Sequence, residues 1–276
     1  MTTKVGFIGL GSQGGPMARR IVEEGYPLTI WARSPATLEP FRDTAATVAS
    51  TPSQVGAASD VVAICVVADA DVDEVLLGPN GVLAGMSTGG IVAIHSTIHP
   101  DTCQALADRA AERGIKVVDA PVSGGGSAAK ERRLLVMAGG DEDSVARCRP
   151  IFETFADPVI HLGPLGSGQL AKVLNNFVFT AHIALALETY SFADRLGMDR
   201  ATVACVLADG SGGSGAASVV AAAGFAAPGL RPAAALLRKD VGIMFDVARA
   251  KGAVEPVALT ALARRTLELL GHTADA

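Results

Sequence analysis

Residue types and spacing suited to binding a pyrophosphate lie near the start of the chain, in the run Gly9-Leu10-Gly11-Ser12-Gln13-Gly14. In this GxGxxG spacing the first glycine permits a tight turn, the second lets the backbone approach a phosphate, and the third lets a helix pack closely on a strand. The run follows an apolar stretch, Val5–Ile8, and opens a helix-like one, Gly14–Glu24. The start of that helix would offer amide groups and a positive dipole end to the phosphates. An ordinary glycine-rich turn is the simpler alternative, but position and register favour a dinucleotide site.

The residues after the next apolar stretch, Leu28–Trp31, bear on which dinucleotide binds. Chains that bind NAD usually carry an acid there for the ribose 2′-hydroxyl. This chain has Arg33 and Ser34, and no acid follows until Glu39. A guanidinium beside a hydroxyl suits a 2′-phosphate, to which it can donate two parallel hydrogen bonds. We therefore expect NADP, with NAD as the alternative if Arg33 only stacks over the adenine.

Lys172 and Asn176 could move a proton. They are four residues apart on Ser167–Leu196, which the sequence predicts to be one long helix, so they share a face. They follow the glycine-rich break Gly163–Gly168, where we expect a cleft. A neutral lysine amine can take the proton of a substrate hydroxyl as a hydride leaves the carbon, and its ammonium form can return it. This needs a pKa below the usual value of about 10.4, through desolvation or a nearby cation. Asn176 would orient the hydroxyl or the lysine; an exposed helical lysine is the ordinary alternative.

Small residues follow a later apolar stretch, Ile115–Asp119. The amide groups of Ser123, Gly124 and Gly125, with the serine hydroxyl, could bind a substrate carboxylate. A plain glycine turn is the alternative. Val67 ends another apolar stretch, where its backbone would lie beside the ribose of the nicotinamide.

Four ordered motifs together resemble the β-hydroxyacid dehydrogenases related to 3-hydroxyisobutyrate dehydrogenase: Val5–Gly11 with Gly14 and Pro16–Ala18, Asp119–Gly125, Gly166–Asn176, and Lys239-Asp240. The resemblance implies hydride transfer between NAD(P) and a small 3-hydroxy acid or its semialdehyde. It also implies that Thr97 contacts the nicotinamide region and that Lys239 lies near cofactor and substrate. From the residues alone, Thr97 could equally belong to a helix cap before Pro100, and Lys239 could be a surface lysine.

Two features depart from the family pattern. Gln13 stands where many members have methionine, and Asp209–Ser218 is unusually rich in glycine and serine. An imine reductase of the same architecture is one alternative function, although such enzymes generally lack the lysine. A non-catalytic NADP-binding sensor is another.

The elements that must position these residues alternate in the first half of the chain. Strand-like and helix-like stretches in βαβαβ order predict an α/β Rossmann domain with a doubly wound, mostly parallel sheet. From Gly163 on, only helix-like stretches follow. We expect a dinucleotide-binding domain at residues 1–164 and an all-helical domain for substrate and oligomerisation at residues 165–276, joined by the long helix.

Composition narrows the partners. With 276 residues, a net charge of −5 and 49% hydrophobic residues, the chain suits a two-domain enzyme with a small-molecule carboxylate substrate better than a nucleic-acid binder. We expect no metal site, because the four cysteines are scattered and His95 and His99 lack supporting ligands. We also expect no membrane helix, because no run of about 18 uncharged apolar residues occurs, and no signal peptide, because the start has no basic region before a long apolar stretch. The expected location is the cytoplasm. The apolar residues of Phe177–Leu187 exceed one monomer face, which predicts a homodimer or homotetramer through the helical domain.

Overall fold

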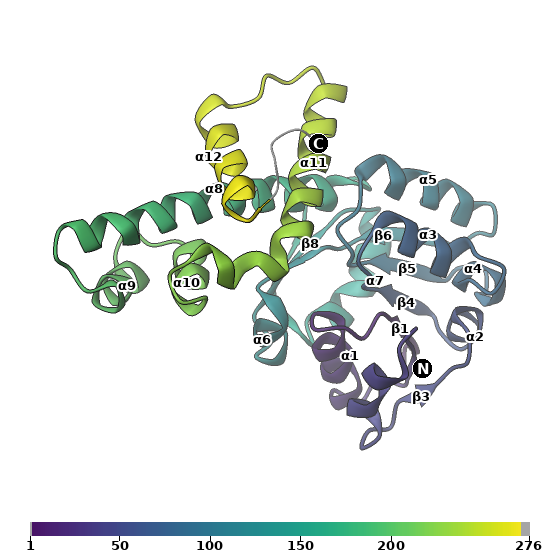
Figure 1. The fold of residues 1–276 in the computed structure, drawn as a ribbon. Helices are drawn as coiled ribbons and strands as arrows, with labels where there is room; N and C mark the ends of the chain where they lie inside the picture. The colour runs from purple at the N-terminus through teal and green to yellow at the C-terminus, as the bar shows by residue number, and fades with distance from the viewer. Residues whose placement is uncertain (1, 272–276) are drawn as a thin grey trace. The chain divides into compact units, whose positions relative to one another are not determined.

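The computed structural model describes residues 2–271, and its contacts divide the chain into two compact units, Met1–Lys172 and Val173–Ala276 (Figure 1). The sequence analysis placed the boundary at residue 164, and the contacts place it after Lys172. The difference has a physical cause, because the first turn of the long helix is hydrogen-bonded into the first unit, as described below.

The first unit is built on a parallel sheet with the strand order β3-β2-β1-β4-β5-β6. Its strands are β1 (Val5–Ile8), β2 (Leu28–Trp31), β3 (Thr47–Val48), β4 (Val61–Ile64), β5 (Ile91–Ile94) and β6 (Lys116–Asp119). All residues of β1, β4 and β5 are buried, as expected for strands covered on both faces. From β1 the strands are added first on one side of the sheet, as β2 and β3, and then on the other, as β4, β5 and β6. Ligands usually bind at the carboxyl ends of the two strands where this order reverses, here β1 and β4. The predicted fold class is confirmed.

Helices cover both faces of this sheet (Figure 1). On one face lie α1 (Gly14–Glu23), α6 (Gly125–Lys130) and α7 (Glu142–Phe152); on the other lie α2 (Pro52–Ala57), α3 (Asp69–Leu77), α4 (Val82–Gly85) and α5 (Pro100–Ala111). The segment after β2 is a 3-10 helix, η1 (Pro35–Phe41), with Pro35 in its first turn and Pro40 in its last. One hydrophobic cluster on each face packs the sheet against its helices, and the polar residues lie in the loops at its edge.

A second, smaller sheet completes the first unit. It consists of β7 (Val122–Ser123), β8 (Leu134–Ala138) and β9 (Ala156–His161), with β7 antiparallel and β9 parallel to β8. Neither β7 nor α6 was expected from the sequence, because a run of glycines gives no apolar period to follow. Helix α6 forms because Ala128 and Ala129 are buried, and because α6 packs against α1.

The second unit is helical throughout its described residues, which end at residue 271. It contains most of α8 (Ser167–Arg195), with α9 (Arg200–Asp209), α10 (Gly215–Ala222), η2 (Ala227–Ala233), α11 (Ala234–Ala250) and α12 (Val257–Leu269). Its core surrounds Phe177 and Tyr190 of α8, and the tyrosine hydroxyl donates to the Ala217 carbonyl at 3.1 Å. Ser214 caps α10 by accepting from the Ala217 amide, so part of the glycine- and serine-rich segment starts a helix.

Helix α8 is long and apolar enough to cross a membrane by length and composition, with a mean hydropathy of 1.4 in its most apolar window. The bent pair of α10 and the run 227–250 passes the same test when taken together. The core helix of a soluble protein also passes this test, and α8 supplies buried side chains to the core of the second unit.

Candidate active site

The glycine-rich turn between β1 and α1 has the geometry that a pyrophosphate requires. Gly9 has a φ of +94°, and a Cβ there would lie 2.2 Å from the Cys65 carbonyl oxygen. A Cβ at Gly14 would lie 2.1 Å from the Gly9 carbonyl oxygen. At Gly11, in contrast, nothing lies within 4 Å of the position of a Cβ. Gly9 and Gly14 are therefore needed for packing, whereas the missing side chain of Gly11 leaves open space beside the turn.

Helix α1 begins without a side-chain cap. Gln13 occupies the N-cap position, but its amide contacts the Met17 sulfur at 3.8 Å and does not cap the helix. The first turn also contains no acidic residue. An uncapped helix start next to an open turn suits a phosphate, because the backbone amides and the helix dipole both favour an anion. Leu10 and Ser12 form the remainder of the turn, and the residues present fit the pyrophosphate of NAD(P).

Arg33 is paired with two acids, although no acid lies near it in the sequence. Its Nη2 lies 3.0 Å from Oδ1 of Asp71 and 3.0 Å from Oε2 of Glu74, both in α3. Ser34 precedes η1, and its carbonyl accepts from the Thr37 hydroxyl at 2.8 Å. The two acids lie 38 and 41 residues further along the chain, so the spacing around Arg33 could not show them.

The loops after β4 and β5 are tied to each other and to α8. The Val66 amide donates to the Ser96 hydroxyl at 2.8 Å, which places exposed Val67 next to this contact. The buried side-chain amide of Gln169 donates from its nitrogen to the Ser96 carbonyl at 2.8 Å, and its oxygen accepts from the backbone amide of Ile98 at 3.1 Å. Gln169 therefore holds the backbone on both sides of Thr97, the residue expected to meet the nicotinamide region.

Asp119 fixes the start of α8. One carboxylate oxygen accepts from the Gly166 amide at 2.8 Å, and the other accepts from the Gln169 amide at 2.7 Å. The side chain is fully buried, and burial raises the pKa of the Asp119 carboxyl although these amides stabilise its charged form. A Cβ at Gly139 or Gly168 would lie within 3 Å of one of its oxygens, so both glycines make room for it.

This cluster was missed in the sequence analysis. Asp119 was noted only as the end of a strand and the first residue of one family motif, and Gln169 only as part of another motif. The available signal was an acid that ends an apolar run, followed much later by a glycine-rich break with a glutamine directly after it. Lys172 follows Gln169 by less than one helical turn, so Asp119 and Gln169 determine where the lysine backbone lies.

The loop Ser123–Gly125 joins β7 to α6. Gly124 and Gly125 have φ values of +128° and +76°, which favour glycine at both positions. Nothing lies within 4 Å of a Cβ at Gly125, whereas a Cβ at Gly126 would lie 2.3 Å from the Ser12 carbonyl oxygen. The expected substrate loop therefore has an open side at Gly125 and backs onto the cofactor turn at Gly126.

In the second unit, a buried carboxylate links two of the expected site residues. Oδ2 of Asp240 accepts from the side-chain amide of Asn176 at 2.5 Å. Nζ of Lys239 lies 2.8 Å from Oδ1 of Asp240, an ion pair whose angles do not meet those of a hydrogen bond. Oδ1 of Asn176 accepts from the Asn175 amide at 3.1 Å. Asn176 lies one turn after Lys172 on α8, so the two side chains share a face of the helix, as predicted.

His95 and His99 have structural roles. His95 is buried, and its Nδ1 bonds to the Ala120 carbonyl at 2.6 Å, whereas His99 caps α5 by accepting from the Asp101 amide. Within residues 2–271, no group of three or more His, Cys, Asp or Glu side chains is arranged to hold a metal ion.

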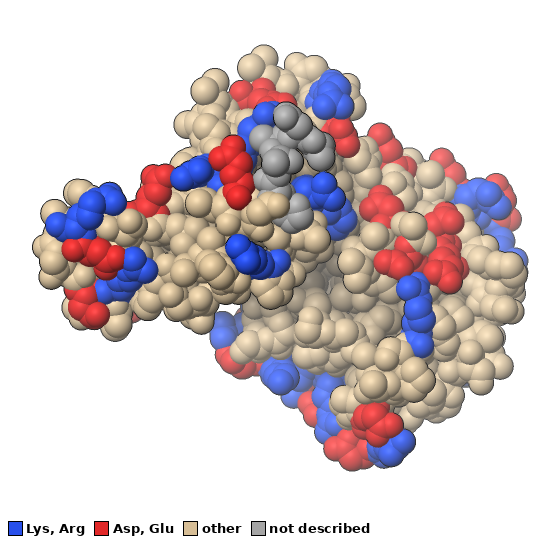
Figure 2. All heavy atoms as spheres, in the orientation of Figure 1, with Lys and Arg blue, Asp and Glu red and all other residues tan. Residues whose placement is uncertain are grey.

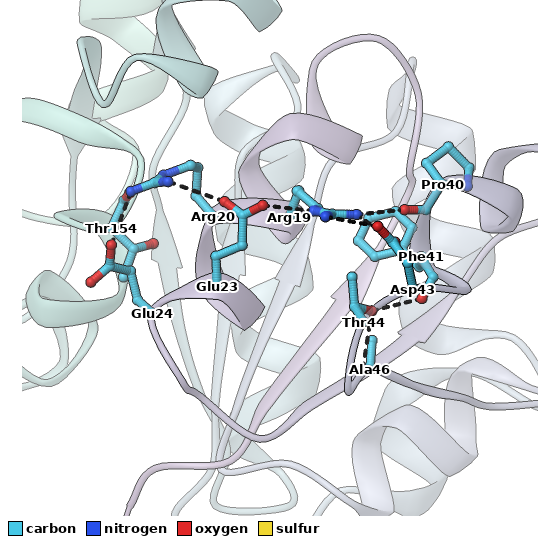
Figure 3. Close-up of polar contacts among 10 residues, drawn as sticks. All are labelled: Arg19, Arg20, Glu23, Glu24, Pro40, Phe41, Asp43, Thr44, Ala46 and Thr154. Atoms are coloured by element: carbon cyan, nitrogen blue, oxygen red, sulfur yellow. Dashed lines mark hydrogen bonds and ion pairs between the residues drawn. The ribbon is translucent and has the colours of Figure 1, made fainter.

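A surface cavity of about 520 Å³ lies beside the glycine-rich turn, between α1 and η1, and Leu10, Gly11, Thr37 and Phe41 are among its lining residues. Arg19 at its rim is paired with Asp43 and Glu23, and Arg20 bonds to the Thr154 carbonyl (Figure 3). These arginines fasten α1 to its surroundings and are already matched by acids or carbonyls. None of the expected catalytic or substrate-binding residues lines this cavity.

The comparisons with known proteins agree with this arrangement. A family model described as the NAD binding domain of 6-phosphogluconate dehydrogenase matches residues 4–163, and a second, described as NAD-binding of NADP-dependent 3-hydroxyisobutyrate dehydrogenase, matches residues 166–275. The chain belongs to the β-hydroxyacid dehydrogenase family. As a member of this family it is an NAD(P)-dependent oxidoreductase, which confirms the predicted family and cofactor class.

Relatives of this β-hydroxyacid dehydrogenase include the 3-hydroxyisobutyrate dehydrogenase of Pseudomonas aeruginosa, which is 31% identical over 97% of this chain and 92% of its own length. The Mycobacterium tuberculosis 3-hydroxyisobutyrate dehydrogenase solved with L-serine has a TM-score of 0.82 at 28% identity, with 100% of this chain and 96% of that chain covered. Psf3 solved in complex with NADP+ and 2-OPP has a TM-score of 0.77 at 26% identity, with coverages of 94% and 99%. An imine reductase from Pseudomonas sp., at 18% identity, shares the fold alone.

Proposed function

We propose that this protein transfers a hydride between NADP and a small 3-hydroxy acid or its semialdehyde, with Lys172 as the general acid and base. The nicotinamide, when bound, accepts or supplies the hydride. Lys172 takes the proton of the substrate hydroxyl during oxidation and returns it to the carbonyl oxygen during reduction. The similarity to 3-hydroxyisobutyrate dehydrogenases supports this substrate class.

The start of α8 carries the proposal. A buried carboxylate and a buried amide, those of Asp119 and Gln169, fix the first turn of this helix to the ends of β5 and β6. Such a firmly held helix start is what a proton-transferring lysine needs, because general acid and base catalysis depends on placement within hydrogen-bond reach. Lys172 is the ionisable residue that follows this anchor.

The other site residues have supporting roles in the proposal. Asn176 orients the substrate hydroxyl or Lys172, with its amide held by Asp240. Ser123, Gly124 and Gly125 bind the substrate carboxylate, and Lys239 adds a positive charge for it. On the cofactor, Gly9–Gly14 bind the pyrophosphate, Arg33 and Ser34 the 2′-phosphate, and Val67 and Thr97 the nicotinamide side.

A panel of 3-hydroxy acids, semialdehydes and imines, each offered with NAD and NADP, tests the function through the absorbance of the reduced cofactor. We expect turnover of a 3-hydroxy acid or semialdehyde, reduced at least about a hundredfold in Lys172→Ala while NADPH still binds. Lys251→Ala removes an exposed lysine elsewhere and serves as the matched control. Full turnover by Lys172→Ala would disprove the lysine's role. Turnover of imines alone would make the protein an imine reductase, and NADPH binding with no turnover would make it a sensor.

We also propose a homodimer or homotetramer that assembles through the second unit, in the cytoplasm. Leu185, Phe192 and Leu196 of α8 are exposed apolar side chains, and an apolar surface of this kind is typical of a subunit interface. All four cysteines are free thiols, as in proteins of a reducing compartment. Light scattering should give a multimer that Phe192→Glu weakens; a monomeric mass for the unmodified protein would contradict the assembly.

A further inference from the structure

The contacts of Arg33 extend beyond those that a phosphate-binding arginine needs. Both protons of its Nη2 face acids, with Asp71 and Glu74 each 3.0 Å away. Within residues 2–271, its Nε and Nη1 make no hydrogen bond. The guanidinium is therefore held by one edge and keeps its other edge for a ligand.

The setting of the three residues is open to solvent. The Arg33 side chain is 63% exposed and that of Glu74 is 69% exposed, while Asp71 is 28% exposed. Acidic side chains gather over α3, with a basic side chain against them (Figure 2). A pair of this exposure is weak enough for a ligand to rearrange, but its charges still act on anything bound beside it.

A 2′-phosphate brought to Arg33 would meet two carboxylates. It carries about −1.5 to −2 charges at neutral pH, which the acids repel. It must also share a guanidinium whose charge these acids already offset. The 2′-hydroxyl of NAD is neutral and meets no such repulsion. The acids therefore act against one cofactor and leave the other nearly unaffected.

We propose that Asp71 and Glu74 are specificity-determining residues that lower the preference of this site for NADP over NAD by holding Arg33 through one edge. This inference rests on the proposed assignment of Arg33 to the 2′-phosphate. Arg33 attracts the phosphate, the acids on α3 reduce that attraction, and the balance sets the ratio of the two affinities.

The acids of α3 offer variants that separate this role from a general effect of charge. Within the described residues, the polar contact of the Glu74 side chain is the one with Arg33, so Glu74→Gln changes little else. Asp71 also accepts from the Ala68 amide at 3.1 Å, a bond that Asp71→Asn can keep. Asp73 is exposed on the same helix and makes no contact with Arg33, so Asp73→Asn is the matched control for charge.

The experiment measures cofactor binding directly, without a substrate. Trp31, the one tryptophan of the chain, lies two residues before Arg33, and its fluorescence reports the binding of NADP+ and NAD+. We expect Glu74→Gln to tighten NADP+ binding by about three- to fivefold and the double variant with Asp71→Asn by about tenfold. NAD+ binding should change less than about twofold, and Asp73→Asn should change the NADP+ affinity less than either variant. In an Arg33→Ala background the gain from Glu74→Gln should be smaller, because Glu74 then acts on the phosphate only by direct repulsion and no longer by engaging the guanidinium.

Two results would overturn the inference. Unchanged or weaker NADP+ binding in Glu74→Gln would mean that the acids do not compete with the phosphate. An equal gain for NAD+ and NADP+ would mean that they act on the shared part of the cofactor. Neither result depends on turnover, so the proposed dehydrogenase activity can fail while this inference stands, and the reverse also holds.

Discussion

The first unit contains two polar clusters that differ mainly in their exposure to water. Asp119 and Gln169 are fully buried and bond to backbone groups of loops and of α8. Arg33, with Asp71 and Glu74, lies at the surface and bonds side chain to side chain. Buried hydrogen bonds have no water to replace them, so they fix positions. Exposed ion pairs exchange with water and ions, so they adjust affinities and can be rearranged by a ligand. In the proposed function, depth therefore separates the residues that position the catalytic lysine from the residues that select the cofactor.

Removing the buried carboxylate should have the largest effect. Asp119→Ala leaves the Gly166 and Gln169 amides without their acceptor, and we expect a loss of about 3–5 kcal/mol in the free energy of unfolding. Urea denaturation measures this loss, with Asp73→Ala on the surface as the control. A cost no larger than that of the control would erase the distinction between the two clusters.

Buried His95 should make the free energy of unfolding depend on pH, an effect that an exposed histidine would not have. Burial lowers the pKa of His95 to about 4, from about 6.5 in the unfolded chain. Between these values the unfolded state binds the extra proton, so the stability that neutral His95 provides is lost as the pH falls from about 6.5 to about 4. The loss should reach about 3 kcal/mol, and His95→Gln should remove this part of the pH dependence of unfolding. An unchanged dependence in the variant would show that other groups cause it.

The Asp240 cluster of the second unit combines the two kinds of environment, since Asp240 is buried and Lys239 is partly exposed. Asp240→Asn keeps the shape of the side chain but removes the charge that holds Lys239 and the Asn176 amide. We expect kcat to fall about tenfold, with a shifted pH profile of kcat and little change in NADPH binding. Asp240→Glu should restore part of the rate. A fall in stability without a change in the pH profile would assign Asp240 to the fold alone.

The smallest effect is expected for the ion pairs around Arg19. The Arg19 guanidinium holds the pKa of Asp43 below its usual value, yet Asp43 is exposed and the pair can be replaced by water. Asp43→Asn should shift Tm by less than about 3 °C, and added salt should reduce the shift. A large shift that persists at high salt would mean that surface pairs in this protein also fix positions.

Periodic and local features were readable from the sequence. The apolar runs of β1, β4 and β5, the turn at Gly9–Gly14 and the shared face of Lys172 and Asn176 all follow from spacing within one segment. Contacts between distant segments were not readable. Nothing near Asp119 indicates that it caps a helix almost fifty residues later, and nothing near Arg33 reveals the acids of α3. Helix α6 was missed because tertiary packing on α1, rather than helix propensity, stabilises a glycine-rich segment.

The close approach of Gly126 to Ser12 limits which positions of the proposed substrate loop can be varied. Side chains can be added at Gly125, where the space is open, although its positive φ adds strain. A side chain at position 126 would collide with the carbonyl of the cofactor turn. Mutant libraries that test the proposed substrate loop should therefore vary its beginning and keep Gly126 constant, because a side chain at position 126 would displace the glycine-rich turn.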